Sequence, residues 1–213
     1  MQLSWYGQSC FKIESRDITI AVDPFSKDIG LTPPRFQSDA VLVTHAHSDH
    51  ANVATLPGSP FLIQGAGEYE VKGVSVVGIK TFHDAISGQE RGLNTVYVIE
   101  IDDIKICHLG DFGEEKLREE TQEAIGDVDI LLIPVGGTYT IDGKAAANIV
   151  HTIEPRIVIP MHYKIPGLSI SLSTAEPFLK EMGMKNPETI EKLSIKKKDL
   201  PQEETRVFIL KPA

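Results

Sequence analysis

The sequence lacks the features that mark several large classes of protein. It contains only two cysteines, Cys10 and Cys107, far apart in the chain. We therefore expect two buried thiols in a reducing compartment and not a disulfide framework. No apolar run approaches the roughly 18 residues of a membrane helix, and the first residues have neither the basic start nor the apolar core of a signal peptide. The expected location is the cytoplasm, with no membrane partner.

Basic residues are also scarce. Lysine and arginine number 21 against 30 acidic residues, so the formal net charge is −9. Such a chain has no general attraction for phosphate backbones, and its one basic run, at 196–198, is typical of a solvated face. The chain also lacks a Gly-x-x-x-x-Gly-Lys-Ser/Thr phosphate loop. A nucleic-acid partner is therefore not expected.

The sequence does contain many short strand patterns, followed by strands that alternate with helices. Composition is ordinary for a globular protein, with 41% hydrophobic and 24% charged residues. Strands are predicted at 10–14, 17–22, 40–43, 61–63, 69–71, 74–79, 94–101, 104–108, 130–135, 156–161 and 206–210. Helices are predicted at 114–125, 145–153 and 173–183, the last from an apparent capping box at Ser173 and Glu176. This order predicts one α/β domain over 1–213, with layered sheets flanked by helices.

One short pattern occurs twice. Residues 13–20 and 99–106 both fit Ile-Glu-x-x-Asp-Ile-x-Ile, and each run leads toward an aspartate, Asp23 or Asp111. Two interpretations remain open. The match is either a coincidence between two ordinary hairpins or the trace of an old duplication that produced two similar halves.

Four potential metal ligands fall within six residues directly after an apolar run. They are His45, His47, Asp49 and His50, in a chain with seven histidines in all. In an extended segment alternate side chains share a side, so His45 and His47 could bind one metal. Asp49 and His50 would face a second metal only if the backbone turns there, for example into a helix. A polar loop that contains three histidines by chance is the weaker interpretation.

Further ligand candidates follow predicted strands. His83, Asp111 and His162 each lie at the end of a strand pattern, whereas His108 lies inside one and His151 lies inside a predicted helix. Catalytic zinc keeps about three protein ligands and an open position, so these strand ends could complete two sites. We expect packing or support from His108 and no role for His151. Gly110 is expected to leave space for metals to approach the backbone.

Together these residues resemble the metallo-β-lactamase-fold superfamily of hydrolases. The matching features are His-x-His-x-Asp-His at 45–50, a lone His83, Asp111 in His-Leu-Gly-Asp and His162 in Pro-Met-His-Tyr. The stretches 5–11, 67–70 and 134–140 are similar to the small bacterial hydrolases related to the L-ascorbate-6-phosphate lactonase group. The resemblance covers essentially the whole chain. It implies a four-layer αββα sandwich of two mixed β-sheets flanked by helices, with metals at one edge.

The resemblance also implies a ligand set. His45, His47 and His83 would bind a first metal, Asp49, His50 and His162 a second, and Asp111 would bridge the two. Asp23 would support the histidine loop without binding metal. The best-known β-lactamases of this fold carry cysteine at the bridging place, so antibiotic hydrolysis is not expected.

An imidazole and carboxylate ligand set suits two divalent ions, with Zn²⁺ the first choice and Mn²⁺ or iron as alternatives. Two such ions can hold a hydroxide ready as the nucleophile. Asp49 either acts as a ligand alone or also orients the hydroxide or shuttles its proton. Candidate substrate contacts are Tyr139, Tyr163 and Lys164. The expected function is hydrolysis of a small ester, lactone or phosphoester. The alternatives are a nuclease or phosphodiesterase of the same fold and a non-catalytic metal-binding protein.

Overall fold

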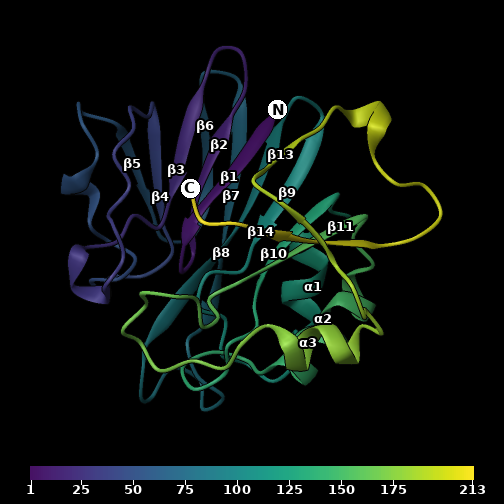
Figure 1. Cartoon of the computed structure of the whole chain (residues 1–213). Coiled ribbons are helices and arrows are strands. Elements are labelled where there is room, and N and C mark those ends of the chain that lie inside the picture. Colours follow the sequence, from purple (N-terminus) through teal and green to yellow (C-terminus); the bar gives the residue numbers. More distant parts are fainter.

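Two β-sheets face each other in the computed structural model, which describes residues 1–213 (Figure 1). In spatial order, the six-stranded sheet contains β13 (Lys192–Ser194), β1 (Gln2–Gly7), β2 (Cys10–Glu14), β3 (Thr19–Val22), β4 (Ala40–Val43) and β5 (Phe61–Gln64). The eight-stranded sheet contains β12 (Glu188–Ile190), β14 (Arg206–Leu210), β11 (Ile157–Met161), β10 (Ile130–Pro134), β9 (Ile104–His108), β8 (Leu93–Ile101), β7 (Val74–Phe82) and β6 (Gly67–Val71). Both sheets mix parallel and antiparallel pairs, which confirms the predicted α/β sandwich.

The α-helices lie beside only one of the sheets. Helices α1 (Glu119–Ile125), α2 (Gly143–Ile153) and α3 (Glu176–Glu181) gather beside the eight-stranded sheet, where α1 contacts β7 and α2 contacts β10 and α3 (Figure 1). None of these helices has the length and apolar character needed to cross a bilayer. On the six-stranded sheet, Val41 and Val43 pack instead with Leu56 and Phe36. The expected outer helical layer there is reduced to loops and the 3-10 turns η1 (Lys27–Ile29) and η2 (Val53–Thr55).

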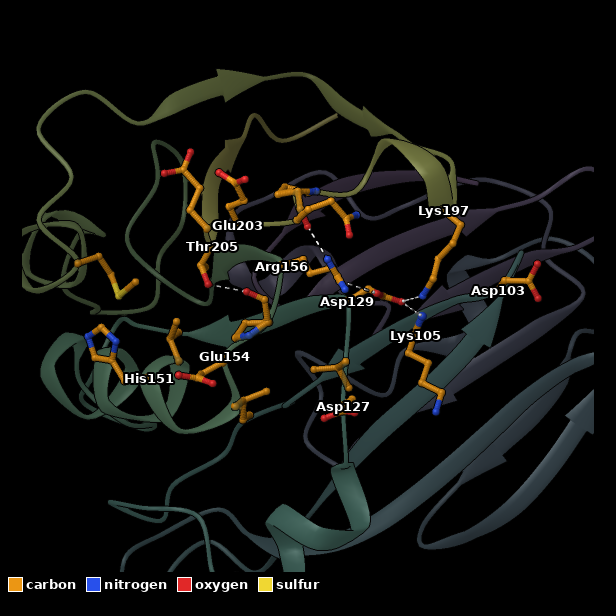
Figure 2. A pocket seen from close by; sticks show the side chains of 18 of the residues that line it. Asp103, Lys105, Asp127, Asp129, His151, Glu154, Arg156, Lys197, Glu203 and Thr205 are labelled. Atoms are coloured by element: carbon orange, nitrogen blue, oxygen red, sulfur yellow. Dashed lines mark hydrogen bonds and ion pairs between the residues drawn. The ribbon is translucent and has the colours of Figure 1, made fainter.

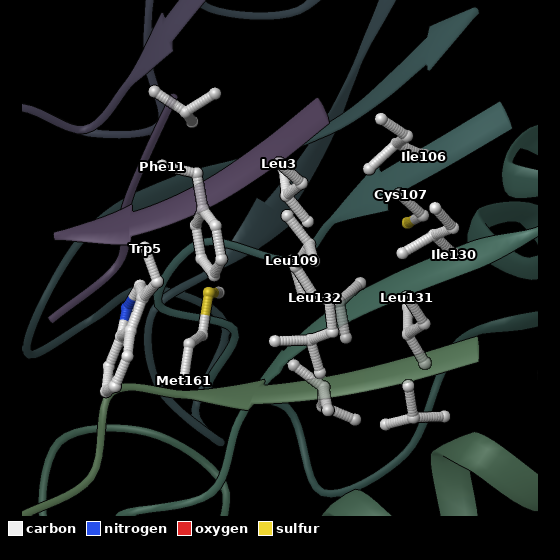
Figure 3. Packing of buried hydrophobic residues seen from close by; sticks show 14 of the residues in the cluster. Leu3, Trp5, Phe11, Ile106, Cys107, Leu109, Ile130, Leu131, Leu132 and Met161 are labelled. Carbon is white, nitrogen blue, oxygen red and sulfur yellow. The ribbon is translucent and has the colours of Figure 1, made fainter. Parts of the chain in front are cut away.

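The hydrophobic core fills the space between the sheets. Leu3, Trp5 and Phe11 reach in from β1 and β2, and Leu132 and Met161 meet them from β10 and β11 (Figure 3). Strands β10 and β11 are buried along their whole length, because helices cover the face that points away from the core. Both cysteines are buried and free, as predicted.

The repeated sequence pattern occupies equivalent positions in the two sheets. Ile13 pairs with Ile20 across β2 and β3, and Ile99 pairs with Ile106 across β8 and β9. The strand order β1-β2-β3-β4-β5 has the same directions as β7-β8-β9-β10-β11: two antiparallel pairings followed by two parallel ones. This shared topology favours duplication over coincidence.

Several predicted elements differ from the structure. Strand β1 and the three-residue strands β12 and β13 were not predicted. The helix predicted from 114 begins only at Glu119, because the Glu114 carboxylate instead accepts the Phe82 N–H and pairs with Arg118. The capping box was wrong: Ser173 is bound through its backbone to Gly136 and Lys164, and α3 begins at Glu176 without a side-chain cap.

Candidate metal centre

The predicted ligands meet because their strands end at the same edge of the sandwich. The His45–His50 loop follows β4, His83 follows β7, Asp111 follows β9 and His162 follows β11. Strands β9 and β11 are both parallel to β10, and β7 runs the same way because two antiparallel pairings separate it from β9. Their carboxyl ends therefore lie together, as in other sheets of this kind.

Left-handed backbone conformations mark three strand ends at this edge of the sandwich. Gln8, Asp23 and His162 follow β1, β3 and β11 directly, with φ of 51°, 46° and 51°. Residues other than glycine rarely adopt positive φ, and such residues cluster at functional sites. Each one turns the chain sharply as it leaves its strand, at the edge where the candidate ligands gather.

Asp111 lies at the middle of the cluster. Its Oδ2 atom is 3.2 Å from the Nε2 atom of His162, 3.3 Å from those of His50 and His83, and 3.9 Å from that of His45. One carboxylate oxygen cannot satisfy four imidazoles, and the buried Nε2 atoms of His45 and His50 have no hydrogen-bond partner. Buried polar atoms are normally satisfied, so this arrangement fits a bound cation.

The seven predicted ligands form three overlapping groups, each compact enough to hold a metal ion. The groups are His45, His47 and His83; Asp49, His50 and His162; and His45, His50 and Asp111, with ligand atoms within 4.8 Å of one another. The first two correspond to the two ligand sets implied by the family resemblance, and the third places Asp111 between them. Nitrogen and carboxylate donors without thiolate fit zinc, manganese or iron. That these side chains bind metal remains a prediction.

Asp23 fixes the orientation of the histidine loop. Its Oδ1 atom accepts the Thr44 N–H at 2.8 Å, and its Oδ2 atom lies 2.7 Å from Thr44 Oγ1 and 2.9 Å from His50 Nδ1. The single proton of the Thr44 hydroxyl is donated to Asp23. The hydroxyl oxygen is therefore the acceptor for the N–H at His45 Nδ1, 3.0 Å away. His45 then carries its proton on Nδ1 and presents the Nε2 lone pair to the centre, and the contact of Asp23 with His50 Nδ1 turns the Nε2 atom of that ring toward the centre as well.

The loop itself is neither extended nor a helix, but it does turn at Asp49 and His50, the condition that the sequence set for a second site. It bends after β4 and closes in a single turn, in which the N–H groups of His50 and Ala51 both donate to the His47 carbonyl at 3.0 Å. The bend still brings the rings of His45 and His47 to 4.7 Å between centroids. His47 is exposed, whereas His45 and His50 are buried.

Burial and neighbouring charges shift the pKa values in opposite directions. Burial and the nearby His50 lower the pKa of His45 to about 3. Burial would lower the pKa of His50, but the Asp111 and Asp23 carboxylates hold it well above its usual value. Burial would raise the pKa of Asp111, but His162 and His50 hold it well below. At neutral pH Asp111 is therefore ionised and His45 is neutral, the forms in which both can bind a metal.

Sequence reasoning missed the contribution of the turn between β1 and β2. Gln8 Nε2 donates to Asp49 Oδ2 at 3.0 Å, and the Gln8 carbonyl accepts the N–H of His162 at 3.0 Å. The Ser9 hydroxyl donates to Asp111 Oδ1 at 3.4 Å. The turn thus joins ligands from both sheets. The only sequence signal for this role was the similarity of residues 5–11 to one branch of the superfamily.

His108 supports the same turn from the other sheet. Its Nε2 atom lies 2.9 Å from the Ser9 carbonyl, and its Nδ1 atom accepts the Gly110 N–H at 3.0 Å. The ring is fully buried and packs edge-on against Phe11. Both ring nitrogens are occupied, so His108 acts as a buried support, one of the roles expected from the sequence.

Gly110 has a role between the two sheets that was not expected from the sequence. A Cβ atom there would lie 2.4 Å from Asn94 Oδ1 and 2.8 Å from Thr44, so the glycine permits the two sheets to approach each other. Asn94 Oδ1 also accepts the Asp111 N–H at 2.9 Å. Gly136 has a similar role, because its Cβ would lie 2.1 Å from the His162 carbonyl oxygen.

A cavity of about 340 Å³ opens over the cluster. Its lining includes five of the predicted ligands, His47, Asp49, His83, Asp111 and His162, together with Asp28, Ile29, Ser48, Arg91, Tyr139, Ser169 and Ile170. This volume suits a small molecule. Tyr139 lies in the wall, where a substrate contact was predicted.

Tyr163 and Lys164 do not line this cavity, so the structure does not support the substrate contacts predicted for them. Tyr163 is buried against Trp5, with 5.2 Å between ring centroids, and burial raises its pKa to about 12. The Lys164 ammonium binds the Leu168 carbonyl instead. The left-handed turn at His162 redirects the chain directly after the ligand, so its neighbours point elsewhere.

A larger hollow of about 800 Å³ lies at the other edge, where β10, β11 and β14 begin (Figure 2). Its central charges satisfy one another. The Asp129 carboxylate accepts the Lys105 N–H at 2.9 Å and pairs with Lys197 at 2.8 Å and Arg156 at 3.5 Å. His151 lies on the rim, exposed and away from the metal ligands, as expected. The arrangement ties the C-terminal segment to the sheet and resembles a structural ion-pair network.

Comparisons with known proteins agree with this geometry. A family described as "Beta-lactamase superfamily domain" matches residues 2–162. A UPF0173 metal-dependent hydrolase from Thermococcus onnurineus is 32% identical over 190 residues, which cover 76% of this chain and 84% of that protein. A crystal structure of a protein from Thermotoga maritima, described as a member of the metallo-beta-lactamase superfamily, has a TM-score of 0.80 and 34% identity, covering 98% of this chain and 97% of that one. The metallo hydrolase Igni18 from Ignicoccus hospitalis shares the fold, with a TM-score of 0.67 and 21% identity over 92% of this chain and 99% of its own.

Proposed function

The chain belongs to the metallo-β-lactamase superfamily, and from this premise we propose that it is a metal-dependent hydrolase with two metal ions in one centre. The observation that carries the proposal is the convergence of four imidazole Nε2 atoms on the buried carboxylate of Asp111, beneath a cavity of small-molecule size. We propose a small ester, lactone or phosphoester as the substrate, and the cytoplasm as the location.

Two sets of side chains would hold the metals. His45, His47 and His83 would bind one ion, Asp49, His50 and His162 the other, and Asp111, which faces histidines of both sets, would bind both. Zn²⁺ is the proposed ion, with Mn²⁺ or iron as alternatives. Such ions, when bound, supply Lewis acidity that polarises a scissile carbonyl or phosphoryl group and lowers the pKa of water.

Asp49 is the proposed catalytic side chain. Burial would raise its pKa, but hydrogen bonding and charge from His50 keep it below the usual value, so the carboxylate is ionised at neutral pH. It is only half-buried and lines the cavity, and Gln8 holds its Oδ2 atom. Its Oδ1 atom is thus free to orient an attacking water and to accept its proton.

The remaining residues around the centre orient these groups. Asp23 sets the direction of His45 and His50, and Ser9 and Asn94 hold the side chain and backbone of Asp111. Such partners commonly matter 10–100-fold for metal affinity or activity. The acidic net charge of −9 gives no support for a nucleic-acid substrate.

The experiment that tests the proposal is a substrate panel with controlled metal content. The chain is stripped with a chelator, reloaded with Zn²⁺ or Mn²⁺, and assayed on small lactones, carboxylic esters, phosphomonoesters, phosphodiesters and RNA. We expect turnover of one of the small-molecule classes only after reloading, and its loss in Asp49→Ala. Activity confined to RNA would favour the nuclease alternative, and metal binding without turnover would favour the non-catalytic one.

A further inference from the structure

Arg91 lies in the cavity wall without an acidic partner. Its guanidinium stacks on the ring of Tyr139, 4.7 Å from the ring centroid, and none of the chain's ion pairs includes it. Arg91 lines the cavity together with Asp111 and His83. It also lines a neighbouring hollow beside His45 and His47. A half-buried arginine in a chain with nine surplus negative charges would ordinarily be expected to pair with a carboxylate.

The loop that carries Arg91 is rigid. The Asp84 carboxylate is buried beneath it and accepts four backbone N–H groups, those of Ile86, Gly88, Glu90 and Arg91, at 2.9, 2.7, 3.0 and 2.8 Å. The loop begins at the candidate ligand His83, whose N–H donates to the Gly92 carbonyl at 3.1 Å. The loop therefore fixes the backbone of Arg91 relative to the metal centre before any substrate arrives.

The charge of the cavity wall points to an anionic group. Apart from the candidate metal ligands, the charged side chains of the lining are Arg91 and Asp28. Asp28 is exposed, its Oδ2 atom accepts the Ser26 hydroxyl at 2.9 Å, and it forms no ion pair with Arg91. The contact with the ring uses no N–H donor in a hydrogen bond to an acid, and the planar fork of a guanidinium matches a carboxylate or phosphate.

We propose that Arg91, held against Tyr139, binds an anionic carboxylate or phosphate group of the substrate, so that the enzyme selects esters or lactones that carry a negative charge away from the scissile bond. This inference rests on the proposed hydrolase function. Arg91 acts as a specificity residue, because it meets a part of the substrate that does not react. Tyr139 orients Arg91 and shields one face of the guanidinium from water.

The test uses matched esters that differ only in charge. Zinc-loaded protein is assayed on mono-4-nitrophenyl succinate and on its methyl ester, and on 4-nitrophenyl 3-phosphonopropanoate and its dimethyl ester. We expect kcat/KM to favour the charged member of at least one pair by about tenfold or more, the scale of one charge-assisted hydrogen bond. The pair with the larger ratio distinguishes a carboxylate from a phosphate.

Variants then locate the source of the preference. Arg91→Gln should reduce the charged-to-neutral ratio about tenfold, mainly through KM, and Arg91→Lys should be intermediate because it keeps the charge but loses the planar fork. Tyr139→Leu should lower the ratio less. Lys180→Gln removes the same charge from exposed α3, outside the cavity lining, and should keep the parent ratio. Zinc content and thermal melting of each variant show that it is folded.

Calorimetric binding of succinate and methylphosphonate to the same proteins separates this inference from the hydrolase proposal. If no ester is hydrolysed but Arg91→Gln weakens anion binding about tenfold, the hydrolase proposal fails and the anion site is supported. If both members of each pair are hydrolysed with equal efficiency in parent and variant, the anion site is overturned and the hydrolase proposal stands. If Arg91→Gln leaves anion binding unchanged, the proposed anion site at Arg91 is also overturned.

Discussion

The two sheets contribute to the centre in different ways. The six-stranded sheet provides four candidate ligands in one loop, 45–50, which Asp23 orients through hydrogen bonds to Thr44 and His50. The eight-stranded sheet provides His83, Asp111 and His162, one from each of three strand ends. The first set lies on one loop and is oriented by hydrogen bonds from Asp23 and Gln8 of the same sheet, whereas strand register and close backbone approaches bring the second set together. The geometry of one half therefore depends on one supported loop and that of the other depends on the whole sheet.

The two halves share a topology, so two aspartates at equivalent places can be compared directly. Asp23 follows β3 and Asp111 follows β9, the second strands of equivalent hairpins. Both carboxylates are buried, but Asp23 contacts the Nδ1 side of His50 and Asp111 contacts the Nε2 side. One therefore orients the histidines from behind, while the other faces them across the centre.

The largest effect is expected from Asp111→Ala, because Asp111 touches histidines from both halves. Turnover should fall by several orders of magnitude, since the clamp that positions two metals is lost. The measurement is a rate assay on purified, zinc-loaded protein. His151→Ala, on the exposed side of α2, is the matched control and should keep the parent rate. An Asp111→Ala protein as active as the parent would refute the bridging role.

Asp23→Ala should have the next largest effect, which should be confined to the ligands of the 45–50 loop. Zinc affinity should fall 10–100-fold, because His50 loses its contact with Asp23 and the Thr44 hydroxyl that contacts His45 loses its own acceptor. Competitive zinc titration against a chelating dye measures this change. Asp23→Asn should be less damaging, because its amide oxygen can still accept the Thr44 N–H. Parent affinity in both variants would show that the loop does not need this support.

Gln8→Leu tests the turn that joins the halves, and we expect a smaller effect. The change removes the 3.0 Å hydrogen bond to Asp49 without adding charge, so turnover should fall about tenfold, the low end for such partners. Gln8→Glu should lower it further, because a second carboxylate would face Asp49. Rates equal to that of the parent in both variants would show that turnover does not depend on the hydrogen bond from Gln8 to Asp49.

His108→Gln should change the pH dependence of stability more than stability itself. Burial lowers the pKa of His108 in the folded state, whereas an unfolded histidine titrates near 6.5. The unfolded chain then binds the extra proton as the pH falls below about 6.5, so His108 makes folding less favourable in acid. Glutamine cannot titrate. In chelator-treated protein, urea unfolding at pH 7.5 and 5.5 should therefore show a smaller loss of stability in the variant, and equal losses would contradict this assignment.

Sequence reasoning succeeded where the information is local. The loop at 45–50 was recognisable from spacing alone, because its ligands are neighbours in the chain. The hairpins at 13–20 and 99–106 were recognisable from their repeated pattern, and their shared pairing was then observed. The strand ends at His83, Asp111 and His162 were consistent with ligands, but only the family resemblance assigned them to two sets.

The remaining features depend on contacts between distant residues. The Ser9 hydroxyl bonds to Asp111, which is 102 positions away in the sequence. Glycine is needed at position 110 because Thr44, from the other sheet, lies too close for a Cβ atom. Arg91 and Tyr139 are apart in the sequence and meet only in the cavity wall. Tyr163 and Lys164 were misassigned because proximity in sequence to His162 was taken as proximity to the site, whereas the left-handed turn there redirects the chain.

The central claim is that both halves together hold two metal ions. Its most direct test is elemental analysis of the parent chain after saturation with zinc and removal of free ion, with protein concentration from amino-acid analysis. The account predicts about two zinc ions per chain, and about one after His162→Ala, which removes a proposed ligand of the second ion. A saturated parent chain that holds one zinc ion or none would contradict the account.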